Sequence, residues 1–195
     1  MPTTDRDPPP APVPSRLLLI GAPGSGKGTI GAALAEWLGV PHVSSGRLLR
    51  ATVAHGDPYG IGPRLGAGQF APDDLVTRIV TERLGDGFIL DGYPRTDEQA
   101  ALLDAVLAAR GRPLQLVLEL DVPDEEVEAR VARRASTEAR QDDTPGTVRA
   151  RLAIWHSEAG PLRAHYGDLV RRIDAVGPPG EVVERAKAAL RAARR

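Results

Sequence analysis

Short apolar runs alternate with longer amphipathic segments along most of the chain. The apolar runs are rich in Leu, Ile and Val, which is typical of strands buried on both faces of a sheet. We expect strands at Leu17–Ile20, Pro41–Val43, Phe88–Leu90, Leu114–Leu120 and Leu169–Ile173. We expect helices at Lys27–Leu38, Gly46–Ala54, Asp73–Leu84, Asp97–Arg110, Asp124–Arg134, Thr147–Tyr166 and Gly180–Ala193. This alternation predicts an α/β fold with a parallel sheet, whose ligands bind beyond the carboxyl ends of the strands.

The composition fits a single globular domain. The chain has 195 residues, 42% of them hydrophobic, and its net charge of −1 argues against bulk electrostatic binding to nucleic acid or to a membrane surface. The chain has no cysteine, which excludes disulfides and thiolate zinc sites and is compatible with a cytoplasmic protein. Residues 1–15 are rich in proline and are expected to form a disordered tail, so the domain should span residues 16–195.

A glycine-rich loop joins the first expected strand to the first expected helix. The run Gly21–Thr29 holds Lys27, one of only two lysines in a chain with 25 Lys and Arg residues. A compact ammonium suits a phosphate cradled by backbone N–H groups better than a planar guanidinium does. The alternative is an ordinary Gly-Pro turn, because the strict phosphate-loop pattern has Ser or Thr directly after the lysine, where this chain has Gly28. The flanking strand and helix favour phosphate binding.

The third expected strand is followed by Asp91-Gly92-Tyr93-Pro94-Arg95-Thr96. An Asp at a strand end near a phosphate loop can hold the water shell of Mg²⁺, and Arg95 can form a forked contact with a phosphate. The alternative is a Pro-Gly turn with a surface Asp and a surface Arg. The glycine loop expected on the neighbouring strand favours the functional interpretation.

Arginines cluster around a short polar loop. Arg130 and Arg134 share one helix face, the loop Ala135–Asp143 contains Arg140, and Arg151 begins the next helix. Such a loop suits a lid that closes on a triphosphate and excludes water, whereas the alternative is a solvated charged face. The clustering favours function for Arg134, Arg140 and Arg151. The four histidines show no metal-ligand spacing.

From about Arg16 to the C-terminal helix, the chain resembles the adenylate kinase family of nucleoside monophosphate kinases. Several separated motifs match the family in order: Gly21–Thr29; Ser45-Gly46 with Arg50; Gly68–Asp73; Asp91–Thr96 with Gln99; Asp121–Pro123 with Arg130 and Arg134; and Arg140, Asp142-Asp143 and Arg151. The resemblance implies a P-loop NTPase core, with a five-stranded parallel sheet ordered 2-3-1-4-5 and helices on both faces. It also implies a monophosphate-binding insertion at about residues 45–73 and a short lid at about residues 135–143.

The resemblance further implies reversible phosphoryl transfer from Mg-ATP to AMP, giving two ADP. The implied ATP-binding residues are Gly24, Ser25, Gly26, Lys27, Gly28, Thr29, Arg130 and Arg134, with Arg130 stacked on the donor adenine. The implied AMP-binding residues are Ser45, Arg50, Ala71, Gly92, Arg95, Gln99, Arg140 and Arg151. The implied catalytic residues are Lys27, Arg95, Arg134, Arg140 and Arg151. Asp91 is expected to bind Mg²⁺ through water, with Thr29 as a further candidate and no zinc. The partners are expected to be nucleotides only, with no nucleic acid and no membrane, and the protein is expected to be a cytoplasmic monomer.

One position departs from the family pattern. An Asp or Glu usually follows the Ser/Thr-Gly pair and helps to order the water shell of Mg²⁺, whereas this chain has Arg47. Either the added cation weakens metal placement or draws in a more anionic acceptor, or it turns to solvent and Asp91 suffices. Three functions stay open: an AMP kinase; a kinase of the same fold that acts on another nucleoside monophosphate or a small phosphorylated or phosphonate acceptor; and a nucleotide-binding protein without transfer activity.

Overall fold

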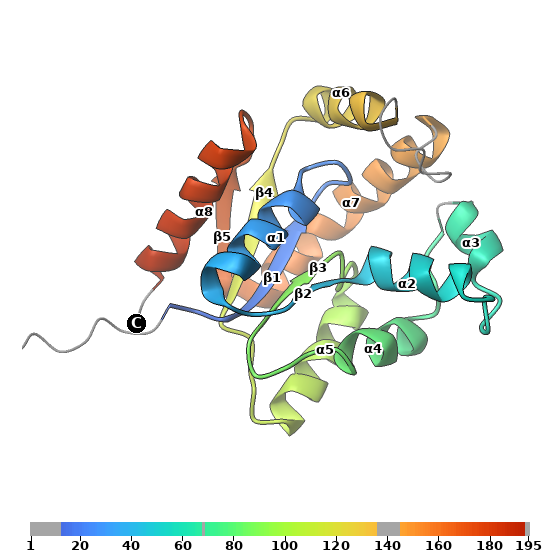
Figure 1. Ribbon diagram of the computed structural model, residues 1–195, viewed down its shortest axis with the longest axis horizontal. Helices are drawn as coiled ribbons and strands as arrows, with labels where there is room; N and C mark the ends of the chain where they lie inside the picture. The colour runs from blue at the N-terminus through green and yellow to red at the C-terminus, as the bar shows by residue number, and fades with distance from the viewer. Residues whose placement is uncertain (1–12, 68, 136–144, 194–195) are drawn as a thin grey trace, which may run out of the picture.

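The computed structural model describes residues 13–67, 69–135 and 145–193, except for the side chains of residues 134, 135 and 145. The strands of the described chain are β1 (Arg16–Gly21), β2 (His42–Ser44), β3 (Phe88–Asp91), β4 (Leu116–Asp121) and β5 (Val170–Asp174). The helices are α1 (Lys27–Leu38), α2 (Ser45–Ala54), α3 (Gly62–Gly66), α4 (Asp73–Thr81), α5 (Asp97–Ala109), α6 (Asp124–Ala135), α7 (Pro145–Tyr166) and α8 (Pro179–Ala192). A 3₁₀ turn, η1 (Gly167–Leu169), leads into β5 (Figure 1).

The five strands form one parallel sheet in the order β2-β3-β1-β4-β5, as the resemblance implied. Leu17 of β1 lies between Ile89 of β3 and Leu116 of β4, so β1 is the central strand. The loop that follows β1 therefore opens at the middle of the carboxyl edge of the sheet, where ligands of such sheets bind.

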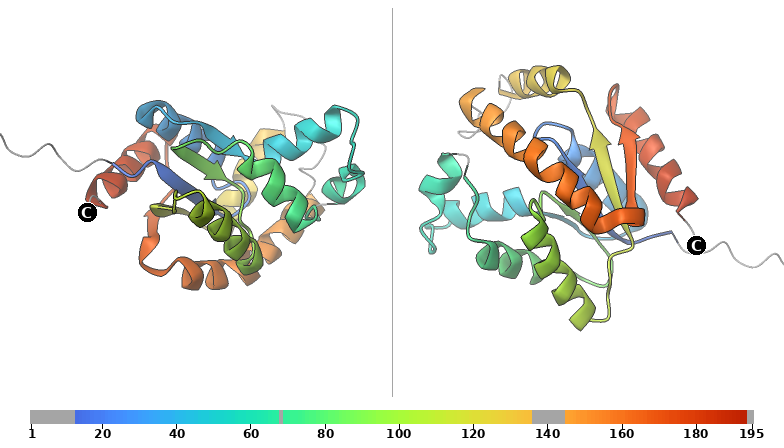
Figure 2. Two further views of the ribbon diagram at one scale, coloured as in Figure 1. Left: turned by 90° about the horizontal axis from the view of Figure 1, so that it is seen from below. Right: turned by 180° about the vertical axis from the view of Figure 1, so that it is seen from behind.

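Successive side chains of β1 enter different halves of the core. Leu17 and Leu19 pack with residues of α1, α6 and α8, whereas Leu18 and Ile20 pack with residues of α4, α5 and α7. All four are at most 3% exposed, which explains why the strand has no polar alternation in its sequence. Figure 2 shows α5 and α7 on the opposite face of the sheet from α1 and α8. The predicted α/β fold, with helices on both faces, is confirmed.

The clearest differences from the sequence-based prediction concern two helices, since the other boundaries shift by only one or two residues. The expected helix at Asp73–Leu84 ends earlier, with α4 closing at Thr81. The short helix α3 was not predicted, because none of its residues is buried and no apolar stripe marks it. Its start is fixed by Asp57, whose carboxylate accepts hydrogen bonds from the backbone N–H groups of Ile61 and Gly62, both at 2.8 Å. A local polar contact, which apolar periodicity does not reveal, therefore sets this helix.

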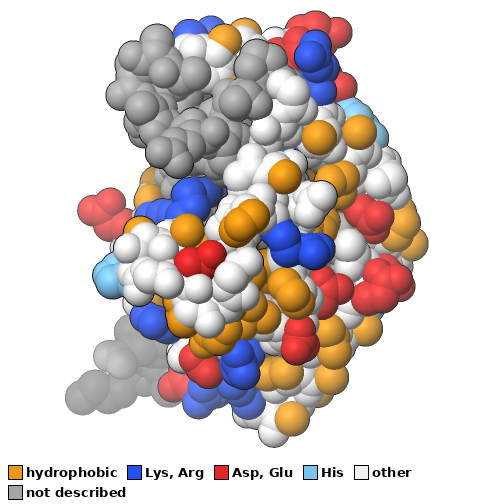
Figure 3. Space-filling view, turned by 90° about the vertical axis from the view of Figure 1, so that its right-hand side faces the viewer, with side chains coloured by type: hydrophobic (Ala, Val, Ile, Leu, Met, Phe, Trp, Pro, Cys, Tyr) orange, Lys and Arg blue, Asp and Glu red, His pale blue; other side chains and the backbone are white. Residues whose placement is uncertain are grey.

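The face of the molecule on the side of α2 and α3 carries scattered charged side chains of both signs (Figure 3). On the face shown in Figure 3, Lys and Arg side chains are interspersed with Asp and Glu side chains and with apolar ones. Within the described ranges, no helix has the length and apolar character needed to cross a membrane.

Candidate active site

The glycine-rich loop between β1 and α1 folds tightly around its own backbone. Gly24 has a φ of 83°, and a Cβ atom there would lie 2.8 Å from a methyl group of Val131 on α6. A side chain at this position would thus be strained and would push α6 away from the loop. Helix α1 begins at Lys27 with no side-chain cap and no acidic residue in its first turn, so its N-terminal amides and its dipole face the loop.

Lys27 points into the loop. Its ammonium group donates hydrogen bonds to the carbonyl oxygens of Gly21 and Ala22, both at 2.7 Å, and to the Ser25 hydroxyl at 3.3 Å. Loop residues Gly24 to Thr29 line a cavity of about 580 Å³. The structure therefore places the positive charge of Lys27 at the wall of this cavity, where the sequence predicted a phosphate site.

Asp91 ends β3, lines the same cavity and is 7% exposed. Burial alone would raise the pKa of its carboxyl group. The neighbouring His42 ring, the Lys27 ammonium and Ser44 outweigh that effect and hold the pKa of Asp91 below its ordinary value of 3.8. Asp91 is therefore ionised at neutral pH, as a group that orders the waters of Mg²⁺ must be.

The unexpected arginine, Arg47, also lines this cavity. Its guanidinium group lies 2.9 Å from Nδ1 of His42, and Nε2 of the same ring lies 3.6 Å from Oδ2 of Asp91. Arg47 therefore contacts Asp91 only through His42. Sequence reasoning considered a cation at the metal or a side chain in solvent, and it assigned no role to His42.

A second cavity, of about 50 Å³, lies where the acceptor nucleotide was expected. Seven predicted acceptor residues line it, from α2, α5, α7, the segment before α4 and the segment after β3: Ser45, Arg50, Ala71, Gly92, Arg95, Gln99 and Arg151. Gly92 has a φ of 77°, and a Cβ atom there would lie 2.9 Å from the hydroxyl of Ser45. Among the described residues, that buried hydroxyl has no hydrogen-bond partner, so it is available to a ligand.

Gln99 is held at both ends of its side-chain amide. Its carbonyl oxygen accepts a hydrogen bond from the backbone N–H of Arg95 at 2.8 Å, and its NH₂ group donates to Asp73 at 2.6 Å. Gln99 is 2% exposed, and its backbone carbonyl accepts a hydrogen bond from the Tyr93 hydroxyl at 3.2 Å. These contacts fix the amide at the wall of the smaller cavity.

Arg95 lies over an aromatic ring that sequence reasoning did not single out. Its guanidinium carbon is 5.0 Å from the centre of the Phe70 ring, and its Nε donates to the Gly92 carbonyl at 2.8 Å. A cation above an aromatic face is held by the ring quadrupole. Phe70 is one of two phenylalanines in the chain and sits in a Gly-rich, otherwise polar segment, which was the available signal.

Arg50 and Arg151 lie between the two cavities. Both line the cavity at the glycine loop, the cavity at Gln99 and a third of about 140 Å³, which also touches Lys27 and Arg95. Helix α2 brings Arg50 to this place, and α7 brings Arg151 from a segment about a hundred residues later. The fold thus gathers predicted donor and acceptor residues around two shared guanidinium groups.

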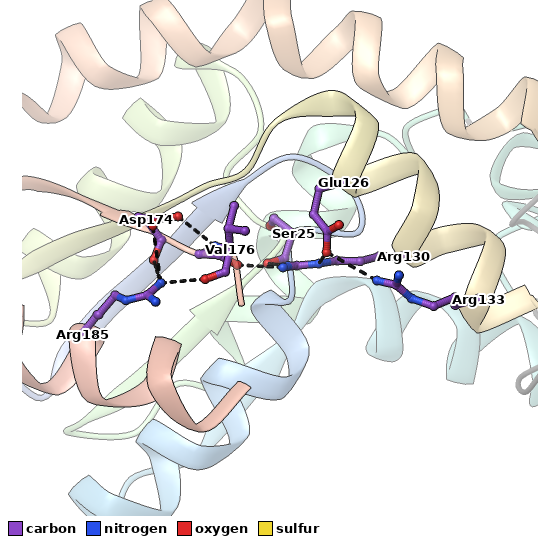
Figure 4. A network of polar contacts seen from close by, with 8 residues as sticks. Ser25, Glu126, Arg130, Arg133, Asp174, Val176 and Arg185 are labelled. Atoms are coloured by element: carbon purple, nitrogen blue, oxygen red, sulfur yellow. Dashed lines mark hydrogen bonds and ion pairs between the residues drawn. The ribbon is translucent and has the colours of Figure 1, made fainter. Parts of the chain in front are cut away.

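Arg130 ties three segments together beside the glycine loop (Figure 4). From α6 it donates to Ser25 O at 3.2 Å, to Ala175 O after β5 at 2.8 Å and to the Glu126 carboxylate at 2.7 Å. Arg130 lines the larger cavity, on the predicted donor side. Sequence reasoning missed Glu126 and Ala175, which orient this arginine.

The remaining predicted residues lie at the edge of the described chain or beyond it. Thr29 is exposed on the first turn of α1 and lines the larger cavity. Arg134 belongs to α6, but its side chain lies outside the described part, and so do Arg140 and most of the expected lid at residues 135–143. Most of the proline-rich tail, residues 1–12, is likewise outside it.

Comparison with known proteins agrees with this arrangement. The adenylate kinase family model matches residues 19–170. The chain is 42% identical over 184 residues to an adenylate kinase of Xylella fastidiosa strain M12, and 43% identical over 185 residues to one of Xanthomonas campestris pv. campestris strain 8004. Each match covers 90% of this chain and 98% of the relative. The chain therefore belongs to the adenylate kinase family.

Proposed function

We propose that this chain moves the γ-phosphoryl group of Mg-ATP to AMP and back, giving two ADP. The observation that supports this most is that Arg50 and Arg151 line both the cavity at the glycine loop and the cavity at Gln99. Two phosphate sites that share positive groups allow a phosphoryl group to pass between them while its charge stays neutralised.

On the donor side, Lys27 and the loop amides hold the ATP phosphates. The ammonium of Lys27 now bonds to neutral oxygens of its own loop, and charged phosphate oxygens are stronger partners for it. The first turn of α1, which has no side-chain cap, adds positive potential at Gly28 and Thr29. Arg130 borders the base of the donor nucleotide from the side of α6.

The residues present fit a magnesium ion that is bound through water. Asp91 is an ionised carboxylate at the cavity wall, and the described chain contains no group of three His, Asp or Glu side chains that could hold a metal ion directly. The exposed hydroxyl of Thr29 is a second candidate. When bound, Mg²⁺ would neutralise charge on the phosphates and help to align them.

On the acceptor side, Arg50 and Arg95 grip the monophosphate. Gln99, Ala71, Gly92 and the unpartnered hydroxyl of Ser45 border the base. Because several of these groups are already fixed by the protein, little ordering is needed when AMP binds.

Arg151 supplies positive charge where the phosphoryl group crosses, together with Arg134 and Arg140 by family resemblance. Residues 45–73 act as the monophosphate-binding insertion, and residues 135–143 act as a short lid that excludes water. The family resemblance leads us to expect a monomeric enzyme. Since ATP and AMP are its substrates, we place the reaction in the cytoplasm.

The test offers AMP, dAMP, CMP, UMP and GMP separately with Mg-ATP and measures ADP formation. We expect the highest turnover with AMP, and we expect Lys27→Ala to lose it while its far-UV circular dichroism is unchanged. A higher rate with another acceptor would reassign the acceptor. Tight ATP binding without transfer to any of the five would contradict the proposed function.

A further inference from the structure

Arg47, His42 and Asp91 form a chain of contacts from the surface to the cavity wall. Arg47 is exposed on the first turn of α2, His42 begins β2 and Asp91 ends the neighbouring strand β3. The His42 and Asp91 side chains are 8% and 9% exposed, so the second half of this chain is nearly dry. A polar group there has few water molecules to replace a missing partner.

The chemistry of the guanidinium group fixes the direction of these contacts. Arginine only donates hydrogen bonds, so Nδ1 of His42, at 2.9 Å from Arg47, must be the acceptor and carry no proton. A neutral ring then carries its proton on Nε2. That nitrogen is the atom that faces Oδ2 of Asp91, and it has no hydrogen-bond partner at normal distance among the described residues.

The protein also restricts where the ring can lie. A Cβ atom at Gly31 of α1 would sit 2.6 Å from Nε2 of His42 and 3.1 Å from its Cδ2. The ring is therefore wedged against the backbone of α1. Turning it over by 180° would put carbon atoms where Arg47 and Asp91 now meet nitrogen, and both polar contacts would be lost.

We propose that Arg47 is a positioning residue that acts through His42: it holds the ring with Nε2–H toward Asp91 and so fixes the carboxylate that faces the Mg-ATP phosphates. This inference rests on the proposed function, because it assumes that Asp91 faces Mg-ATP. Arg47 stands at the position where the family has an acid, and it would help to orient the water shell of the metal indirectly, through His42. Arg47 adds no carboxylate of its own. It instead keeps the Nε2–H donor of His42 beside the carboxylate of Asp91.

The contact itself is tested without turnover, by ¹⁵N NMR of the His42 ring. The spectra are recorded at about pH 8.5, on the alkaline side of the range in which histidine rings change charge. We expect a protonated Nε2 and a bare Nδ1 in the unaltered protein, with the Nδ1 resonance displaced in Arg47→Ala. A protonated Nδ1, or an Nδ1 resonance that is not displaced in Arg47→Ala, would overturn the inference. Arg83→Ala, at an exposed arginine just after α4, is the matched control.

The consequence for the metal is tested by calorimetry with AMP left out, so that no transfer occurs. The measured quantity is the ratio of the affinities for Mg-ATP and for metal-free ATP. We expect Arg47→Ala to lower this ratio about tenfold, the lower end of the range for residues that orient metal ligands. Arg83→Ala should leave the ratio unchanged.

A double-mutant cycle then asks whether Arg47 acts through His42. In a His42→Ala background, Arg47→Ala should have no further effect on the ratio. An equal drop in that background would show that Arg47 acts directly, and an unchanged ratio in the Arg47→Ala single variant would show that it does not act on the metal at all. Failure of the unaltered protein to bind Mg-ATP would instead contradict the proposed function, which separates the two claims.

Discussion

At the scale of single residues, the candidate site depends on side chains that the protein itself holds in place. The Lys27 ammonium sits among three oxygens of its loop, and both ends of the Gln99 amide are bonded. Such side chains lose little conformational freedom when a ligand binds, so they contribute to catalysis through their geometry and charge. Substitutions there should alter catalysis more than stability.

Lys27→Arg should cut kcat by roughly 10²–10³-fold, the range seen when one group that stabilises the transition state is lost. The charge is kept, but the planar guanidinium cannot bond to two loop carbonyls at 2.7 Å in the space of the ammonium. Steady-state kinetics give kcat, and thermal unfolding shows whether the fold is intact. Turnover close to that of the unaltered protein would mean that Lys27 does not touch the transferred group.

Gln99→Ala should raise the KM for AMP severalfold, since loss of a hydrogen bond between neutral groups costs about 0.5–1.5 kcal/mol. The KM for ATP should change little, because Gln99 does not line the cavity at the glycine loop. Gln115→Ala is the control, as its carbonyl oxygen accepts hydrogen bonds from the N–H groups of Ser15 and Arg16, away from both cavities. Equal changes in both KM values would count against the acceptor assignment.

At the scale of elements, α7 carries Arg151 to the site and is anchored at its far end. Arg163 forms two hydrogen bonds to the buried Glu119 of β4, at 2.8 and 2.6 Å. His165 lies between Asp97 and Asp104, at 2.7 and 2.9 Å, which fixes α7 against α5. The position of Arg151 between the cavities thus depends on ion pairs more than ten residues away.

The His165 anchor predicts a pH-dependent stability. The hydrogen bond to Asp104, with that to Asp97, raises the pKa of His165 above its ordinary value of 6.5. The stabilisation that protonated His165 gives to the folded protein is therefore fully present below the pKa of the residue in the unfolded chain. It is lost as the pH rises through the pKa in the folded protein. The partners are partly exposed, so we expect about 1 kcal/mol or less.

Chemical denaturation of the unaltered protein and of Asp104→Asn between pH 5.5 and pH 9 measures this effect. The difference in their free energy of unfolding should be largest at the acidic end and should shrink towards the alkaline end. Asp168→Asn, at an exposed acid outside these two hydrogen bonds, should show a difference that does not vary with pH. A difference that grows with pH would contradict the anchor.

At the scale of the whole molecule, most of the fold could be predicted from local patterns. The central strand Leu17–Ile20 is apolar throughout because both its faces are buried, and its position before the glycine loop fixes where ligands bind. The contacts of Arg47 with His42 and of Arg95 with Phe70 could not be predicted in this way. They join side chains across different elements, and no spacing along the chain records which rotamers meet.

The central claim is that the two cavities exchange a phosphoryl group directly, away from water. The most direct test is to follow ADP and inorganic phosphate together while Mg-ATP is mixed with AMP. We predict two ADP for each AMP consumed, with no inorganic phosphate above the background and no ADP when AMP is left out. Steady release of inorganic phosphate, or ADP formation that does not require AMP, would contradict the account.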